Sequence, residues 1–149
     1  GVRGPRTVII PDINLLVYAY ASDAPFHDEA RRWWEGCLSG RGNVGLPWEV
    51  TVGFIRVMSS AAVFTNPMEA LEAIGHVRSW LDRPQTQIVI PGPRHLDMLA
   101  YIMKASRAPS RLTTDAHLAA LAIETQSELH SNDVDFARFP GLRWRNPLR

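Results

Sequence analysis

Short β-branched runs alternate along this chain with longer segments in which apolar residues recur every three or four positions. The short runs are bounded by proline, glycine and aspartate, which is typical of strands that end in turns. The run at 128–131 has a weak strand pattern, and the run at 142–145 is expected at a sheet edge. Five strands are therefore predicted, at residues 7–10, 44–46, 87–90, 128–131 and 142–145.

The longer segments predict helices. In the second of them, Ala30, Trp33, Trp34 and Cys37 follow the spacing of an amphipathic helix. Pro47 is expected at the first position of its helix, and the pair Thr113-Thr114 is expected to cap the last one, which is alanine-rich and apolar all round. The predicted helices cover residues 14–21, 26–38, 47–58, 68–81, 95–105 and 113–126.

This alternation predicts an α/β fold with three layers, in which helices cover both faces of a mainly parallel central sheet of four to five short strands. The chain has neither repeats nor a linker, so residues 1–149 are expected to form a single domain with a flexible lead at 1–6.

Composition narrows the functional classes. Hydrophobic residues make up 46% of the 149 positions and charged residues 21%, as in a folded globular protein. The single cysteine, Cys37, cannot form an internal disulfide or a zinc site, so a cytoplasmic location is expected. The apolar runs are shorter than the ~20 residues that cross a bilayer. The net charge of +1 neither requires nor excludes a nucleic-acid partner.

Arginine is nearly the only basic residue, because Lys104 is the one lysine. Arginine suits contact with phosphate or with the carboxylates of a partner protein. Arg107 and Arg111 are candidates for such contacts near a binding site. A GC-rich genome would favour arginine equally well, and a role in surface solubility is the alternative for both residues.

Four acidic residues stand at the ends of predicted elements. Asp12 follows the first strand, Glu49 lies in the first turn of a helix, Asp115 starts the last helix, and Asp133 follows the fourth strand. Ligands of open α/β sheets bind beyond the carboxyl ends of the strands, so these four side chains could share one crevice. Taken singly, Glu49 and Asp115 could instead complement a helix dipole, and Asp12 and Asp133 could shape turns.

Clustered carboxylates repel one another unless they bind a cation or protons. Oxygen ligands without cysteine or paired histidines favour Mg²⁺ or Mn²⁺ over zinc. A divalent ion held by carboxylates can polarise a phosphodiester and lower the pKa of a bound water. Phosphodiester hydrolysis is therefore the reaction class that this pattern indicates.

Four segments carry a resemblance to a known family. In order and spacing, they resemble the acidic blocks of the PIN-domain family, and in particular of VapC toxins. The resemblance extends from Val8 to Leu142, and its last two blocks are the most specific. The segments are VIIPDINLLVYAY, PWEVTVGFIRV, TTDAHLAALAIE and HSNDVDFARFPGL.

The resemblance implies an Mg²⁺- or Mn²⁺-dependent endoribonuclease toxin whose metal-binding and catalytic residues are Asp12, Glu49, Asp115 and Asp133. In this interpretation Asp12 and Asp115 hold the principal ion, while Glu49 and Asp133 bind through water or complete a second site. Supporting roles fall to Asn14, which would orient the cluster, to Thr114, which would hydrogen-bond a carboxylate or cap its helix, and to Asp135 as a peripheral fifth acid.

The resemblance also implies partners. The expected substrate is RNA involved in translation, such as tRNA or rRNA. A cognate antitoxin is expected to block the site, and the toxin is expected to form a homodimer. Contact with DNA is expected only indirectly, through the antitoxin, and no membrane is involved.

Three other interpretations remain open at this level. A metal-free ribonuclease would need a pair of histidines as acid and base, but the five histidines show no pairing in the sequence. A phosphatase or receiver-type domain also begins with a strand followed by aspartate, but Asn14 stands where a second acid would be expected. A non-catalytic, protein-binding module could use Trp33, Trp34 and Trp48 as a partner groove, although tryptophans at this spacing more often belong to a core.

Overall fold

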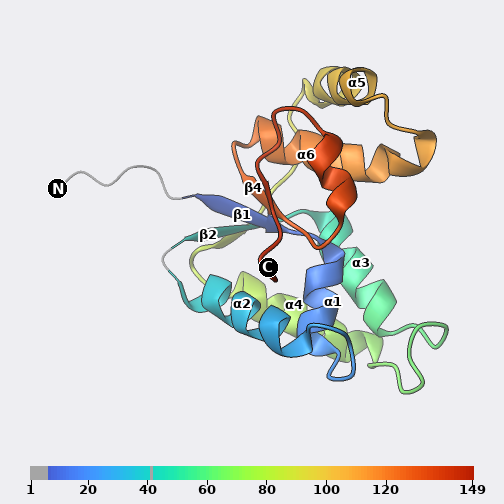
Figure 1. The fold of residues 1–149 in the computed structure, drawn as a ribbon. Helices are drawn as coiled ribbons and strands as arrows, with labels where there is room; N and C mark the ends of the chain where they lie inside the picture. The colour runs from blue at the N-terminus through green and yellow to red at the C-terminus, as the bar shows by residue number, and fades with distance from the viewer. Residues whose placement is uncertain (1–6, 41) are drawn as a thin grey trace.

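The fold places a parallel β-sheet between two layers of helices. The computed structural model describes residues 7–40 and 42–149; the lead expected at 1–6 lies outside them. Four helices lie on one face of the sheet and two on the other (Figure 1), which confirms the three-layer α/β/α prediction. The first group comprises α1 (Ile13–Tyr20), α2 (His27–Ser39), α3 (Trp48–Met58) and α4 (Ala70–Leu81), and the second comprises α5 (His95–Ser106) and α6 (Thr113–Glu124).

All five strands of the sheet are parallel, in the spatial order β3-β2-β1-β4-β5. The chain therefore builds outward from β1 to β3 on one side and then crosses to β4 and β5 on the other. Between β1 and β4 the direction of winding reverses, and such a reversal is where open α/β sheets bind ligands. The strands are β1 (Val8–Pro11), β2 (Asn43–Leu46), β3 (Thr86–Ile88), β4 (Glu128–His130) and β5 (Trp144–Arg145).

Two strands are shorter than predicted by more than a shift of one residue, while the other three differ from their predicted bounds by a single residue at one or both ends. The third was expected at 87–90, but Ile90 is 66% exposed, because the chain leaves the sheet before Pro91. The last was expected at 142–145, yet only Trp144 and Arg145 pair with β4, as an edge strand. Both differences shorten the contact at the sheet margin and leave the central pairings unchanged.

An aromatic cluster joins the four helices on one face of the sheet. Trp80 of α4 is fully buried, and its ring centroid lies 4.8 Å from that of Phe54 in α3 and 5.3 Å from that of Trp34 in α2. Its indole N–H donates a 2.7 Å hydrogen bond to the hydroxyl of Tyr20 in α1. Each of the four helices thus contributes one residue to this cluster. The cluster buries a large apolar area, and the indole N–H of Trp80 has a hydrogen-bond acceptor within it.

On the opposite face, α6 lies against the sheet and is covered on its outer side by α5. The alanine-rich composition lets this helix approach its neighbours closely, and its buried side chains surround the axis, as predicted. Among the described residues, no helix has both the length and the hydropathy that a membrane crossing requires. The buried residues of α6 are Ala116, Leu118, Ala119, Ala120, Leu121 and Ala122.

Several helix starts and caps differ in detail from the prediction. Pro47 is the N-cap of α3, with extended backbone, and not its first helical residue. The helix expected from Met68 begins at Ala70, because the backbone of Glu69 is extended and this residue is the N-cap. The expected threonine cap of α6 is wrong: Thr113 is already helical, and its hydroxyl donates to the carbonyl of Ser110 in a preceding 3₁₀ turn.

Candidate metal centre

The candidate site lies beyond the carboxyl ends of β1 and β4. Pro11 pairs with His130 in the sheet register, and the N–H of Asp12 donates to the carbonyl of His130 at 2.8 Å. This adjacency brings Asp12, at the end of β1, next to the turn that carries Asp133. The reversal of winding between these two strands therefore joins acidic residues that are far apart in the sequence.

Ser131 connects the two acidic residues directly. Its fully buried hydroxyl donates to Oδ2 of Asp12 at 2.7 Å and accepts the N–H of Asp133 at 3.0 Å. Ser131 was not among the site residues predicted from the sequence. A serine two positions before an aspartate, in a polar run after a strand, is the signal that would have identified it, because such hydroxyls commonly bond the backbone two residues on.

Three carboxylates form the cluster itself. One oxygen each of Asp115, Asp133 and Asp135 lies within 4.8 Å of the other two. Asp115 is in the first turn of α6. Asp133 caps the 3₁₀ helix Val134–Arg138, where its Oδ1 accepts the N–H of Asp135 at 2.9 Å. The sequence placed Asp135 at the periphery, whereas in the structure its carboxylate is one of the three.

The electrostatics of the cluster favour a positive ligand. Burial, together with the charges of Asp133, Asp12 and Asp135, raises the pKa of Asp115 to about 6. Burial also raises the pKa of Asp12; the Ser131 hydroxyl and the Ile13 N–H oppose this shift, while the charge of Asp133 adds to it. Carboxylates in this arrangement hold protons more tightly than they would in water, and a cation can take the place of those protons.

The donor set fits a hard divalent cation. The three gathered ligand atoms are all carboxylate oxygens, which Mg²⁺ and Mn²⁺ prefer, and no sulfur or imidazole belongs to the group. Asn14, two residues after Asp12 in the first turn of α1, has a buried Oδ1 atom with no hydrogen-bond partner among the described residues. Such an unpaired oxygen is costly unless a cation or a water uses it.

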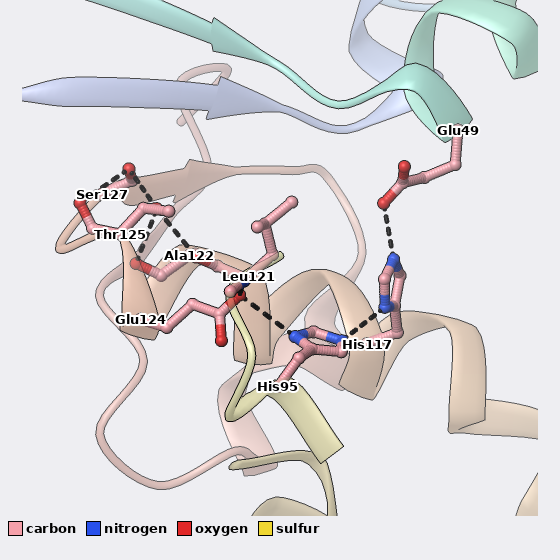
Figure 2. Close-up of polar contacts among 9 residues, drawn as sticks. Glu49, His95, His117, Leu121, Ala122, Glu124, Thr125 and Ser127 are labelled. Carbon is pink, nitrogen blue, oxygen red and sulfur yellow. Dashed lines mark hydrogen bonds and ion pairs between the residues drawn. The ribbon is translucent and has the colours of Figure 1, made fainter. Parts of the chain in front are cut away.

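The remaining candidate residues lie outside the three-aspartate group. Oε1 of Glu49 accepts a 2.6 Å hydrogen bond from Nε2 of His117 (Figure 2). This carboxylate is not part of the three-aspartate group. Thr114 is exposed, and no described residue forms a hydrogen bond with its hydroxyl. Arg111 lies 3.6 Å from Asp135, so one of the two arginines considered from sequence is at the mouth of the cluster.

The positions of the tryptophans and histidines bear on the protein-binding module and on the metal-free ribonuclease. Trp34 is 2% exposed and Trp48 is 54% exposed, so a groove that needs Trp33, Trp34 and Trp48 together is wrong. The histidines, which seemed unpaired in the sequence, include one pair: Nε2 of His95 and Nδ1 of His117 are 2.7 Å apart. This pair joins residues 22 positions apart, on different helices, so no local pattern indicates it.

Ser131→Ala is expected to weaken Mn²⁺ binding by about 10–100-fold, which is the usual cost of losing a residue that orients a metal ligand. The change removes the donor to Asp12 and the acceptor of the Asp133 N–H. Calorimetric titration with Mn²⁺ measures the effect. Ser127→Ala is the matched control, because Ser127 is also buried but bonds Thr125 instead. Unchanged Mn²⁺ affinity in Ser131→Ala would show that Ser131 has no positioning role.

Comparison with known proteins agrees with this geometry. The family model described as the PIN domain matches residues 9–142. Ribonuclease VapC33 of Mycobacterium tuberculosis is 44% identical over 142 residues, covering 95% of this chain and 99% of that protein. Ribonuclease VapC37 of the same organism is 38% identical over 138 residues, covering 93% and 96%.

Solved structures show the same fold at low sequence identity. VapBC2 from Rickettsia felis, bound to a DNA fragment from its promoter, superposes with a TM-score of 0.68 at 15% identity, covering 94% of this chain and 98% of that one. VapC20 of Mycobacterium tuberculosis, described as a sarcin-ricin loop cleaving toxin, superposes with a TM-score of 0.60 at 14% identity, covering 91% and 98%.

Proposed function

Because this chain belongs to the PIN-domain family, we propose that it is a VapC-type toxin, an endoribonuclease that uses Mg²⁺ or Mn²⁺ to cut RNA and so inhibits translation. The observation that carries the proposal is the gathering of Asp115, Asp133 and Asp135 where the winding of the sheet reverses. The 44% identity to a protein named as a ribonuclease supports the same reaction.

In the proposed site, Asp115, Asp133 and Asp135 hold the divalent ion, and Asp12 lies beside them, fixed by Ser131. When bound, such an ion polarises a phosphodiester and favours in-line attack by water, which leaves a 5′-phosphate. Asp12 adds negative charge to the ion's surroundings, and its two hydrogen bonds keep the carboxylate in one orientation. Asn14 supports the site through its unpaired oxygen. This assignment gives Asp135 a larger part than its sequence suggested.

The substrate and partners follow from the same family. We propose RNA of the translation machinery as substrate, with Arg111, whose side chain is 69% exposed, contacting a phosphate at the mouth of the cluster. A cognate antitoxin would bury an apolar segment on this face, where Trp48 and Val52 are exposed one turn apart on α3. A homodimer, contact with DNA only through the antitoxin, and action in the cytoplasm complete the proposal.

The competing enzyme class has less support. A receiver-type or phosphatase domain would be expected to place a lysine beside the acidic site after a late strand. The one lysine, Lys104, is exposed on the last turn of α5. The similarity to PIN-domain ribonucleases over almost the whole chain also favours the nuclease over this alternative.

The proposal is tested by sequencing the 5′ ends of cellular RNA after brief induction of the chain. We expect new 5′-phosphate ends at a small set of sites in tRNA or rRNA. An Asp115→Asn variant induced in parallel defines the background, because it removes one of the three carboxylates that hold the ion in the proposed site. If both proteins give identical ends, the nuclease proposal is wrong.

A further inference from the structure

A row of four side chains links Glu49 to the far end of α6. Oε1 of Glu49 lies 2.6 Å from Nε2 of His117, Nδ1 of His117 lies 2.7 Å from Nε2 of His95, and Nδ1 of His95 lies 3.2 Å from Oε1 of Glu124. Figure 2 shows these residues end to end, reaching from the start of α3 across α6 to the start of α5. Three helices are thus connected through side chains alone.

The Glu124 end of the row is more buried than the Glu49 end. The side chains of Glu124 and His95 are 16% and 12% exposed, and Glu124 also accepts the N–H of Gly92 at 3.1 Å. His117 and Glu49 are 28% and 38% exposed. Packing therefore fixes Glu124 and His95. His95 in turn positions His117, and His117 positions Glu49.

The carboxylates at the two ends of the row determine which ring nitrogens donate hydrogen bonds. Ionised carboxylates can only accept, so Nε2 of His117 and Nδ1 of His95 must both donate outward. The two nitrogens between the rings lie 2.7 Å apart, at hydrogen-bond distance. The other two hydrogen bonds of the row each have an ionised carboxylate as the acceptor. Charge-assisted hydrogen bonds of this kind are among the stronger ones in proteins.

Only one of the two oxygens of the Glu49 carboxylate takes part in the row. Its Oε1 is engaged by His117, while no described residue donates a hydrogen bond to its Oε2. His117 is on α6, two residues after Asp115 of the cluster. Glu49 is therefore held against the helix that carries Asp115 of the cluster.

We propose that His117, His95 and Glu124 are positioning residues that hold Glu49 for RNA cleavage, with one carboxylate oxygen fixed by the row and the other free to serve the reaction. The inference rests on the proposed nuclease function and extends it: Glu49 acts from outside the three-aspartate group, and its orientation depends on two histidines. Neither histidine touches the substrate in this role; both act through Glu49.

The first test is a double-mutant cycle in the full chain. We expect His117→Leu to lower the rate of RNA cleavage by about 10–100-fold, the range found for residues that orient metal-site groups. In a Glu49→Ala background the same substitution should not lower the rate further, because the group it positions is already absent. Losses that instead add in the double variant would overturn the proposal.

Rescue and control variants separate positioning from folding. His117→Gln keeps a side-chain N–H donor for Glu49, so it should recover most of the activity lost in His117→Leu. His76→Leu is the matched control, because His76 lies on α4 against Tyr20, outside the row; it should keep wild-type cleavage. If His117→Gln is as impaired as His117→Leu while both melt at the wild-type temperature, the positioning role is wrong.

A spectroscopic measurement tests the row without metal or RNA. In ¹⁵N-labelled, metal-free protein we expect a strongly downfield imidazole proton from the His95–His117 bond, lost in His95→Leu and shifted in Glu49→Ala. Its absence in the wild type would overturn the inference even if the enzyme cuts RNA. If the wild type neither binds Mn²⁺ nor cuts RNA, the proposed function itself fails, and this is seen before any variant is made.

Discussion

Asp115→Asn is expected to lower metal-dependent RNA cleavage by at least about a hundredfold, since even residues that merely orient a metal ligand are worth about 10–100-fold. Asp115 is one of the three carboxylates that gather within 4.8 Å, so the substitution removes a ligand and one negative charge together. Cleavage of a labelled RNA at saturating Mn²⁺ measures the loss. Asp97→Asn, an exposed aspartate on α5, is the matched control and should retain full activity.

The same substitution should stabilise the protein when metal is absent. Because the pKa of Asp115 is raised to about 6 from 3.8, the folded state binds this proton more tightly than the unfolded state. Stability from this group is therefore present below pH 4 and is lost as the pH rises to about 6. In EDTA, Asp115→Asn should match the wild type near pH 4 and melt at a higher temperature at pH 8. A lower melting temperature at pH 8 would show that the carboxylates do not repel one another.

Trp80→Ala is expected to lower the free energy of unfolding by about 3–5 kcal/mol. The side chain is fully buried, contacts the rings of Phe54 and Trp34, and donates to the Tyr20 hydroxyl, which would lose its partner. A domain of this size is stable by only about 5–15 kcal/mol in total, so this one change removes a large share.

Urea denaturation followed by circular dichroism measures the Trp80 effect. Trp48→Ala removes a side chain of the same size that is 54% exposed, and it should cost far less. Equal losses in the two variants would mean that the aromatic cluster does not hold the four helices together. Because α1 and α3 carry the residues around the site, we also expect Trp80→Ala to weaken Mn²⁺ binding.

The sequence predicts those features of the fold that depend on local periodicity. The order of strands and helices and the all-round burial of α6 are read from spacing and composition, and the structure confirms them. The sequence also indicated that acidic residues at strand ends would be near one another. It did not indicate that the carboxylate of Asp135, and not that of Glu49, lies with Asp115 and Asp133, because this depends on how the turn after β4 orients its side chains.

Features that join distant parts of the chain were not predictable. Ser131 meets Asp12 across 119 positions, and His95 meets His117 only because α5 folds back over α6. The predicted threonine cap of α6 was wrong for a different reason. A preceding 3₁₀ turn draws Thr113 into the helix, so a residue type that favours capping was overruled by the backbone before it.

The reversal of winding between β1 and β4 has a consequence for the synthesis of this protein. Asp12 is translated 119 residues before Ser131, and the turn with Asp133 and Asp135 follows Ser131. Domains generally fold as units, so the acidic residues cannot come together until β4 and this turn have been translated. On every shorter nascent chain the candidate metal centre is incomplete.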